Sequence, residues 1–346
     1  MRARLIVSFS VPVMILMFLT LIGVHQVLIH ENESQVLSSA MSSYNQSYEL
    51  IESHLDMMTY AADSIYYNGD LQRILSDRNY AKELPIDDRY REFLLLNNVF
   101  STAENADLIY RTGIYLRGDI PYTNNAQHIM SLETLFQRSD YMRFIYTVRR
   151  NRYYFSPPVN IYTPGVDQPV RAVTLLRPVR TTDGSNRQIC IAQVSVEVDE
   201  FLKVLSYAHT TDGTFVYLVD EYRQLITTTD PALYRQMKSD RLLPVNGNDE
   251  TWTKVEVGGR AYYMLRRYIS SARWTLTAMI PVEDVEEQSR YVTIVVVLLA
   301  LMTLTAIVSV AILLANSYTR RLKNLNGTIQ RVRSGELAAL QHQDKD

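Results

Sequence analysis

The stretch LSSAMSSYNQSYELIESHLDMMTYAADSI runs from Leu37 to Ile65, and the rest of the chain is organised around it. Its apolar residues recur at alternating steps of four and three, at Leu37, Met41, Tyr44, Tyr48, Ile51, Leu55, Met58, Ala62 and Ile65. This spacing predicts one long helix with an apolar stripe. The helix would be a stalk of about 40 Å within residues 30–80, with a turn near Asn68-Gly69. The stripe fits two partners equally well, a second copy of the helix or the protein's own sheet.

An uncharged apolar run lies on each side of this helix, from Leu5 to Val24 and from Val292 to Ala315. Each is long enough as a helix to cross a hydrocarbon core of about 30 Å. We therefore expect transmembrane helices at 5–29 and 291–316. The first could instead be a cleaved signal peptide, but such apolar regions are usually about 7–15 residues long. The second could be a buried core helix, but one of this length without a polar stripe would be unusual.

The charges next to these runs predict the orientation of the chain. Basic residues follow the second run at Arg320, Arg321, Lys323, Arg331 and Arg333, and Arg2 and Arg4 precede the first. Acidic residues occupy the inner flanks at Glu31, Glu33, Glu283, Asp284, Glu286 and Glu287. Because Lys and Arg collect on the cytoplasmic side, both ends, 1–4 and 317–346, should be cytoplasmic. Residues 30–290 should then lie outside a cell membrane that the chain crosses twice.

The composition of residues 30–290 limits which classes of partner and which kind of organism are expected. Acidic residues outnumber basic ones between His30 and Arg290, so nucleic acid is not expected as a partner. Cys190 is the single cysteine, so the exported part can form no internal disulfide and depends on its core. This suits a bacterial surface better than a eukaryotic one.

Beyond Asn105 the apolar period changes to two, which is typical of strands. A first set of strands is expected at 109–116, 153–155, 172–178 and 189–198, with a helical stretch at 132–148. A second set is expected at 214–219, 224–228, 251–257, 262–268 and 274–280. This order predicts an α+β protein with two units, 81–205 and 206–290, each built on an antiparallel sheet.

The order of span, long helix, two sheet units, span and basic amphipathic helix resembles membrane receptors with a double Cache (dCache, PAS-like) ectodomain and a HAMP helix. The membrane-distal unit is similar in YYFSPP (153–158), VRAVTLLRPVR (170–180) and ICIAQVSVEVDEF (189–201). The membrane-proximal unit is similar in FVYLVDEYRQLITTTD (215–230) and WTLTAMIPVEDV (274–285). RSGEL (333–337) resembles the end of a first HAMP helix. Departures are Arg321, where many HAMP helices have proline, and DEYRQ (220–224), which lacks a common glycine.

The resemblance is strongest to YesM-like sensor histidine kinases of Gram-positive bacteria. It implies a transmembrane signal receptor, the sensor portion of a two-component histidine kinase. Such a receptor detects an extracellular ligand and passes the signal through the second span and a truncated HAMP helix, 317–346. A response regulator would then be reached only through missing downstream domains. A chemoreceptor-type or transcription-regulator receptor with the same sensor, or a stand-alone membrane-anchored binding protein, are the alternatives.

The sequence predicts no catalytic residue, no metal site and no cofactor. The six histidines are scattered without metal-ligand spacing. Gly258-Gly259 is typical of a hairpin turn and does not resemble a phosphate-binding loop.

A ligand site is predicted in the distal unit from its aromatic and guanidinium side chains. The candidates are Tyr115, Arg117, Tyr153, Tyr154, Tyr162, Arg171 and Arg177, together with Ser195. They suit a polar organic or anionic small molecule, free or carried by a binding protein. Any one arginine could instead face solvent. In Cache sensors of amino acids, an Arg and an Asp are expected where Asn151 and Ser195 stand, so the resemblance does not imply an amino-acid receptor.

The stretch SYTRRLKNLNGTIQRVRSGEL, from 317 to 337, predicts a second helix with an apolar seam. We expect a homodimer in which this signalling helix pairs through Leu322, Leu325, Ile329 and Val332, closing near Glu336. Gly327 would cost about 1 kcal/mol of helix stability, and Asn326-Gly327 could end the helix. The alternative is a basic membrane anchor held by anionic lipid.

Overall fold

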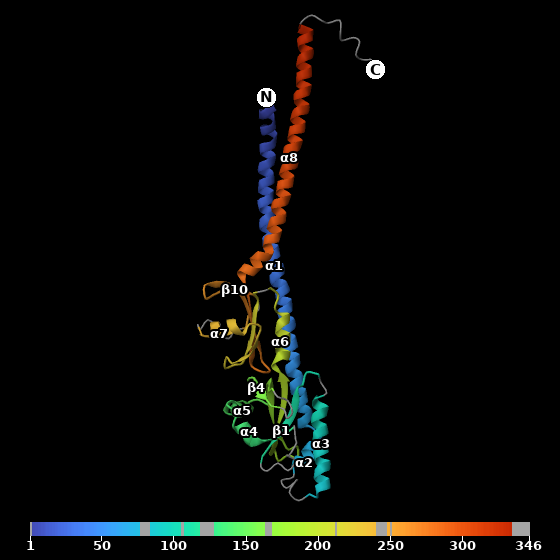
Figure 1. Ribbon diagram of the computed structural model, residues 1–346, viewed down its shortest axis with the longest axis vertical. Coiled ribbons are helices and arrows are strands. Elements are labelled where there is room, and N and C mark those ends of the chain that lie inside the picture. Colours follow the sequence, from blue (N-terminus) through green and yellow to red (C-terminus); the bar gives the residue numbers. More distant parts are fainter. Residues whose placement is uncertain are drawn as a thin grey trace, which may run out of the picture. The chain divides into compact units, whose positions relative to one another are not determined.

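The computed structural model of the chain (Figure 1) describes residues 2–76, 84–104, 107–117, 128–162, 168–211, 213–239, 248–249 and 251–333. The chain divides into two compact units. Leu37–Asp284 form the sheet unit, and the segments before and after it form the helical unit.

Helix α1 (Arg2–Tyr66) is one uninterrupted helix of 65 residues. The predicted turn is present at its end, where the Asn68 Oδ1 accepts a hydrogen bond from the Leu71 N–H at 3.0 Å. Asn68 thereby caps the next helix, α2 (Gly69–Ser76). The long helix therefore ends at Tyr66, and the described residues of the predicted stalk beyond it form the turn and α2, while residues 77–80 lie outside the described residues.

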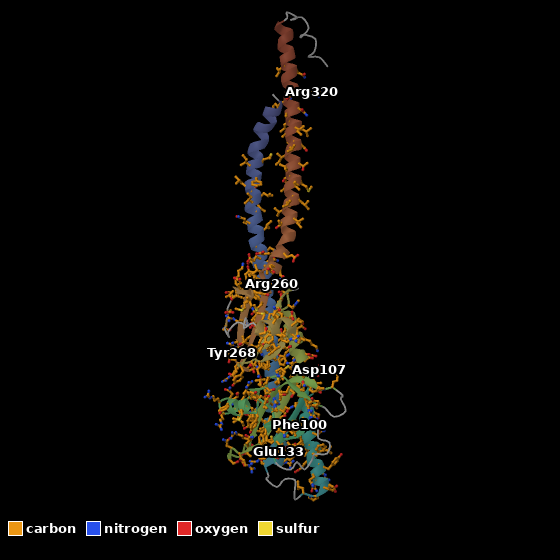
Figure 2. The ribbon with its side chains drawn as sticks, turned by 60° about the vertical axis from the view of Figure 1, so that its left-hand side comes forward. Phe100, Asp107, Glu133, Arg260, Tyr268 and Arg320 are labelled. Carbon is orange, nitrogen blue, oxygen red and sulfur yellow. The ribbon has the colours of Figure 1, made fainter. Side chains whose placement is uncertain are left out.

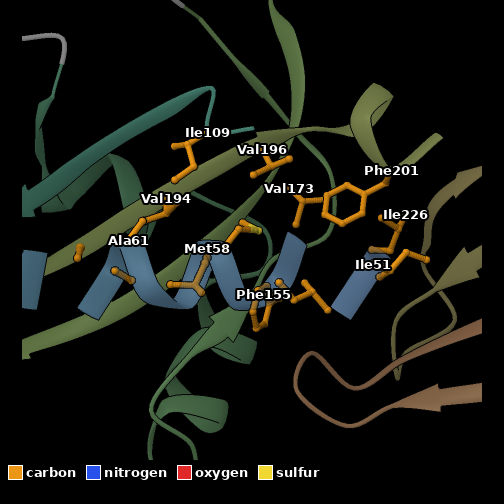
Figure 3. Close-up of a cluster of buried hydrophobic side chains, with 14 of the residues drawn as sticks. Ile51, Met58, Ala61, Ile109, Phe155, Val173, Val194, Val196, Phe201 and Ile226 are labelled. Atoms are coloured by element: carbon orange, nitrogen blue, oxygen red, sulfur yellow. The ribbon is translucent and has the colours of Figure 1, made fainter. Parts of the chain in front are cut away.

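The apolar stripe of α1 packs against the protein's own sheets. Its fully buried members are Tyr44, Ile51, Leu55, Met58, Ala62 and Ile65. Figure 3 shows Ile51, Met58 and Ala61 among strand residues such as Val194 and Ile226. Of the two partners that the spacing allowed, the structure thus shows the sheet, and the stripe is not available to a second copy of the helix.

The first sheet has the strand order β2-β1-β6-β5-β3, with β4 pairing β5. Its strands are β1 (Arg111–Leu116), β2 (Ile129–Ser131), β3 (Tyr154–Phe155), β4 (Val159–Ile161), β5 (Val170–Arg180) and β6 (Gln188–Glu197). The pair β1–β2 is parallel, so the prediction of a purely antiparallel sheet was wrong here. β2 and β4 were not predicted because three residues are too few to show a period of two.

Helices cover both faces of this sheet. α1, α2 and α3 (Ile86–Glu104) contribute to the hydrophobic cluster on one face, while α4 (Leu132–Phe136) and α5 (Tyr141–Val148) contribute to the cluster on the other. The neighbours Leu175 and Leu176 of β5 belong to these two different clusters, as alternation along a strand requires. The predicted helix 132–148 is therefore two helices, separated where Arg138 pairs with Asp140.

The second sheet is antiparallel throughout, with the order β8-β7-β11-β10-β9. Its strands are β7 (Phe215–Val219), β8 (Leu225–Thr228), β9 (Thr253–Val257), β10 (Arg260–Ile269) and β11 (Trp274–Pro281), and α6 (Val198–Tyr207) and α7 (Pro231–Ser239) accompany them. Gly258 and Gly259 form the predicted hairpin turn with φ of 62° and 80°.

The turn between β7 and β8 explains how DEYRQ (220–224) forms a tight turn without the glycine that is common there. Arg223 takes the left-handed conformation with φ of 59°. The Asp220 Oδ1 accepts the backbone N–H groups of Tyr222 at 2.9 Å and Gln224 at 2.7 Å. These bonds hold the turn in a conformation that usually favours glycine.

Helix α8 (Val282–Arg333) follows β11 directly and contains Thr293–Arg321, a segment long and apolar enough to cross a membrane. Its side chains stand out from the ribbon in Figure 2, where Arg320 is labelled. The helix continues through Asn326 and Gly327, which therefore do not end it. The backbone of the predicted first span, 5–29, is helical, but many of its side chains lie outside the described residues.

Candidate functional site

The face of the first sheet opposite α1 carries a group of buried polar side chains. Gln193 and Ser195 lie on β6, and Thr174 lies opposite Ser195 on the neighbouring strand β5. Their exposed fractions are 4%, 0% and 0%. Most other buried side chains of these two strands are apolar, so a polar group at this depth needs a hydrogen-bonding partner or a function.

The hydrogen bonds of this group leave one acceptor unpaired. The Gln193 Nε2 donates to the Ser195 Oγ at 3.1 Å, and the Ser195 and Thr174 hydroxyl oxygens are 3.1 Å apart. The Gln193 Oε1 is buried and has no hydrogen-bond partner among the described residues. An unpaired buried acceptor costs about 1–3 kcal/mol, so a donor brought to this oxygen would be favoured.

A second polar group lies on the same face, where α4 meets α5. The Arg138 Nε and Nη2 donate to the two carboxylate oxygens of Asp140 at 2.9 and 2.8 Å. The Tyr154 hydroxyl donates to the Asp140 Oδ2 at 3.1 Å. Burial raises the pKa of Tyr154, and it raises that of Tyr115 against the opposing effect of Arg138. Both phenols therefore stay neutral, and Arg138 is engaged by Asp140.

The structure divides the predicted ligand residues between the two faces of the sheet. Tyr115, Tyr154 and Ser195 lie on the face opposite α1. Tyr153 immediately precedes Tyr154, and Arg177 immediately follows Leu176, the strand partner of Tyr154. Because neighbouring strand residues point to opposite faces, Tyr153 and Arg177 lie on the α1 face. Tyr153 and Tyr154, although adjacent in the sequence, therefore contact different parts of the protein.

On the α1 face, Arg177 is enclosed by the end of the long helix. Its guanidinium carbon lies 4.0 Å from the centre of the Tyr66 ring and 5.2 Å from that of Tyr153, and it forms an ion pair with Asp63. The Tyr153 hydroxyl donates to the Asp63 Oδ1 at 2.6 Å. Burial lowers the pKa of Arg177 to about 10. These contacts join α1 to the sheet.

The other three predicted ligand residues, Arg117, Tyr162 and Arg171, are exposed. Tyr162 has an exposed fraction of 73%, and its carbonyl oxygen accepts from the Arg111 Nη1 at 3.2 Å. For these three side chains, as for the other five predicted ligand residues, the ligand role stays a prediction.

Sequence reasoning missed Gln193, Thr174, Arg138 and Asp140. The stretch ICIAQVSVE contained a signal for Gln193, because two polar residues two positions apart in an otherwise apolar strand point to one buried face. Nothing in the sequence around Arg138 and Asp140 distinguishes them from surface residues of a helix. Among the residues that the structure describes, no cluster of three or more His, Cys, Asp or Glu could hold a metal ion.

No family model and no curated protein matches the chain. Solved structures do. The periplasmic sensory domain of the Campylobacter jejuni chemoreceptor Tlp1 is 15% identical with a TM-score of 0.53, and the match covers 74% of this chain and 98% of that one.

Two further matches have lower TM-scores. The sensory domain of the C. jejuni chemoreceptor Tlp3 with isoleucine bound is 11% identical with a TM-score of 0.43, covering 76% of this chain and 97% of that one. The extracellular domain of rpHK1S-Z16, described as a histidine kinase, is 17% identical with a TM-score of 0.44, covering 72% and 96%. The likeness to the Tlp1 domain shows that the chain has the fold of a bacterial sensory domain.

Proposed function

We propose that this chain is a transmembrane signal receptor that binds a small polar molecule on the face of the first sheet opposite α1. The observation that carries the proposal is the buried, unpaired Gln193 Oε1 beside the Ser195 and Thr174 hydroxyls. It lies in a fold that the chain shares with a sensory domain.

The ligand that this face suits is a polar organic molecule with at least one N–H or O–H donor. The Gln193 Oε1 can only accept a hydrogen bond, and the hydroxyls beside it can donate or accept. Arg138 is held by Asp140 and is not available to attract an anion. Tyr115 and Tyr154 border the site and can stack on an apolar part of the ligand.

The helices support a role in transmission. β11 ends at Pro281 and α8 begins at Val282, so no linker separates the second sheet from the segment that could cross the membrane. A shift of the sheet would move this helix directly. α1 likewise continues from the helical unit into the core of the sheet unit without a break.

We place residues 30–290 outside the cell and both ends in the cytoplasm, as the flanking charges predict. In this arrangement the chain is a homodimer in the cell membrane and the sensor portion of a two-component histidine kinase. A chemoreceptor-type or transcription-regulator receptor would use the same sensor. The output domain distinguishes them.

The test is ligand-induced thermal stabilisation of the full chain in lipid nanodiscs, screened with polar organic compounds. A ligand at 100 times its Kd adds about 2.7 kcal/mol, which raises Tm by several degrees. Gln193→Leu should abolish this rise. Gln224→Leu is the matched control, because Gln224 also has a buried, unpaired Oε1 but lies beside the second sheet. Equal rises in both variants would remove Gln193 from the site.

A further inference from the structure

A groove of about 850 Å³ lies between α1 and α3, away from the candidate ligand face. α1 lines it at intervals of three or four residues from Glu49 to Ser64, and α3 lines it with residues such as Leu95 and Val99. The stretch of α1 is about 22 Å long. It borders the buried stripe of α1 but presents a different flank of the helix.

The groove and the part of α3 next to it expose large apolar side chains. Tyr60 of α1 has an exposed fraction of 79% and Met57 one of 37%. On α3, Leu95 has 38%, Leu94 47% and Tyr90 63%. Contiguous exposed apolar surface of this kind marks an interaction site more often than chance.

The charge of the groove is of one sign. Glu49, Glu52, Asp56 and Asp70 line it, and none of the described lining residues is Lys or Arg. Asp70 pairs with Arg73 at 3.2 Å, and Glu52 accepts from the Tyr48 hydroxyl at 2.8 Å. Within the described part of the chain, Glu49 and Asp56 form no ion pair.

We propose that the groove binds an amphipathic helix of a partner protein, with an apolar seam flanked by Lys or Arg. A groove of about 22 Å accommodates about 15 residues of helix, or four turns. In helix-in-groove recognition an amphipathic helix lays its apolar face into a groove, and the apolar lining residues Met57, Leu95 and Val99 could receive such a face. Basic flanks would meet the carboxylates of Glu49 and Asp56, which supply specificity and speed association.

A second copy of this chain fits the groove less well. A two-fold interface places the same surface on both partners, so each copy would bring the same carboxylates to the other. Like charges placed together across an interface cost several kcal/mol. The partner is therefore a different, basic protein, and its binding does not depend on the ligand face.

The test uses a fluorescent 16-residue helical peptide with a leucine seam and lysine flanks, and the full chain in nanodiscs. The control peptide carries glutamate at each lysine position. The lysine peptide should bind at least tenfold more tightly, and the difference should shrink at high salt because surface charges are screened. Equal binding of the two peptides would overturn the proposal.

Variants locate the binding. Asp56→Lys should weaken the lysine peptide at least tenfold, whereas Glu133→Lys, at an exposed carboxylate on α4, should leave it unchanged. Both variants should keep the native Tm within a few degrees. Unchanged binding in folded Asp56→Lys would place the peptide elsewhere and overturn the proposal.

A disulfide experiment tests the second copy as the occupant. Tyr60→Cys adds an exposed cysteine to the groove, while the native Cys190 is buried and its thiol pKa is raised by burial. Weak cross-linking, or cross-linking that the lysine peptide suppresses, supports the proposal. Efficient cross-linking that the peptide does not change would show a groove filled by a second copy, and the proposal would fail.

Discussion

At the scale of single residues, neighbouring side chains of one strand have different surroundings. Tyr153 and Tyr154 are adjacent, so they point to opposite faces of the sheet. Which of the two faces α1 covers is decided by residues about 90 positions away, such as Asp63. Tyr154 therefore borders the candidate site, whereas Tyr153 holds α1.

We expect His128 to make the stability of the first sheet depend on pH. Its Nδ1 lies 3.3 Å from the Glu104 Oε1 and 2.9 Å from the Thr112 carbonyl oxygen. The hydrogen bond with Glu104 raises the pKa of His128 against the opposing effects of burial and Arg111. Burial raises the pKa of Glu104, but its hydrogen bonds with His128 and Thr112 lower the pKa by more, so the net shift is downward.

The sign of the effect follows from the direction of the His128 shift. A histidine whose pKa is higher in the folded state stabilises the fold below its unfolded pKa, and this stabilisation is lost as pH rises through the folded pKa. We expect Tm to fall as pH rises above the ordinary histidine pKa of about 6.5, and His128→Gln to remove this part of the fall. An identical pH profile in the variant would show that His128 contributes nothing to it.

At the scale of elements, the length of each helix or strand and the regular spacing of its apolar residues decided whether the sequence could predict it. β5, β6, β10 and β11 have eight or more residues each, and they were expected close to where they occur. α3 was not expected, because only Leu96 and Phe100 of its 19 residues are buried and its other apolar side chains blur the helical period.

The ion pair between Asp63 and Arg177 should show how α1 is attached to the first sheet. Arg177 has an exposed side-chain fraction of 5%, while that of Asp63 is 36%. Removing one partner of a buried pair costs about 3–5 kcal/mol when the remaining charge stays buried. Asp63→Ala strands the buried guanidinium, whereas Arg177→Met leaves a carboxylate that water can reach.

We therefore expect Asp63→Ala to lower the free energy of unfolding more than Arg177→Met does, measured by urea denaturation. Arg171→Met on the same strand is the control, because an exposed substitution usually changes stability by less than about 0.5 kcal/mol. The reverse order of the first two variants would contradict the assigned role of Asp63.

At the scale of the whole molecule, two sheets are present within one compact unit, Leu37–Asp284, and the fold is similar to that of a sensory domain. The division into units 81–205 and 206–290 stays a prediction. The predicted dimer seam of the last helix is only partly described. Leu325 is exposed, the side chains of Leu322, Ile329 and Val332 and the whole of Glu336 lie outside the described residues, and pairing there stays a prediction. A seam between two chains cannot be seen in the fold of one.

We propose that one chain places its sheet unit outside the cell and the end of α8 inside. Cysteine labelling of intact cells with a membrane-impermeant maleimide tests it, because the native Cys190 is buried. We expect Glu133→Cys to be labelled in intact cells, and Gly327→Cys, where a side chain meets open space, to be labelled only after permeabilisation. Labelling of Gly327→Cys in intact cells with protection of Glu133→Cys would show that the chain has the opposite orientation.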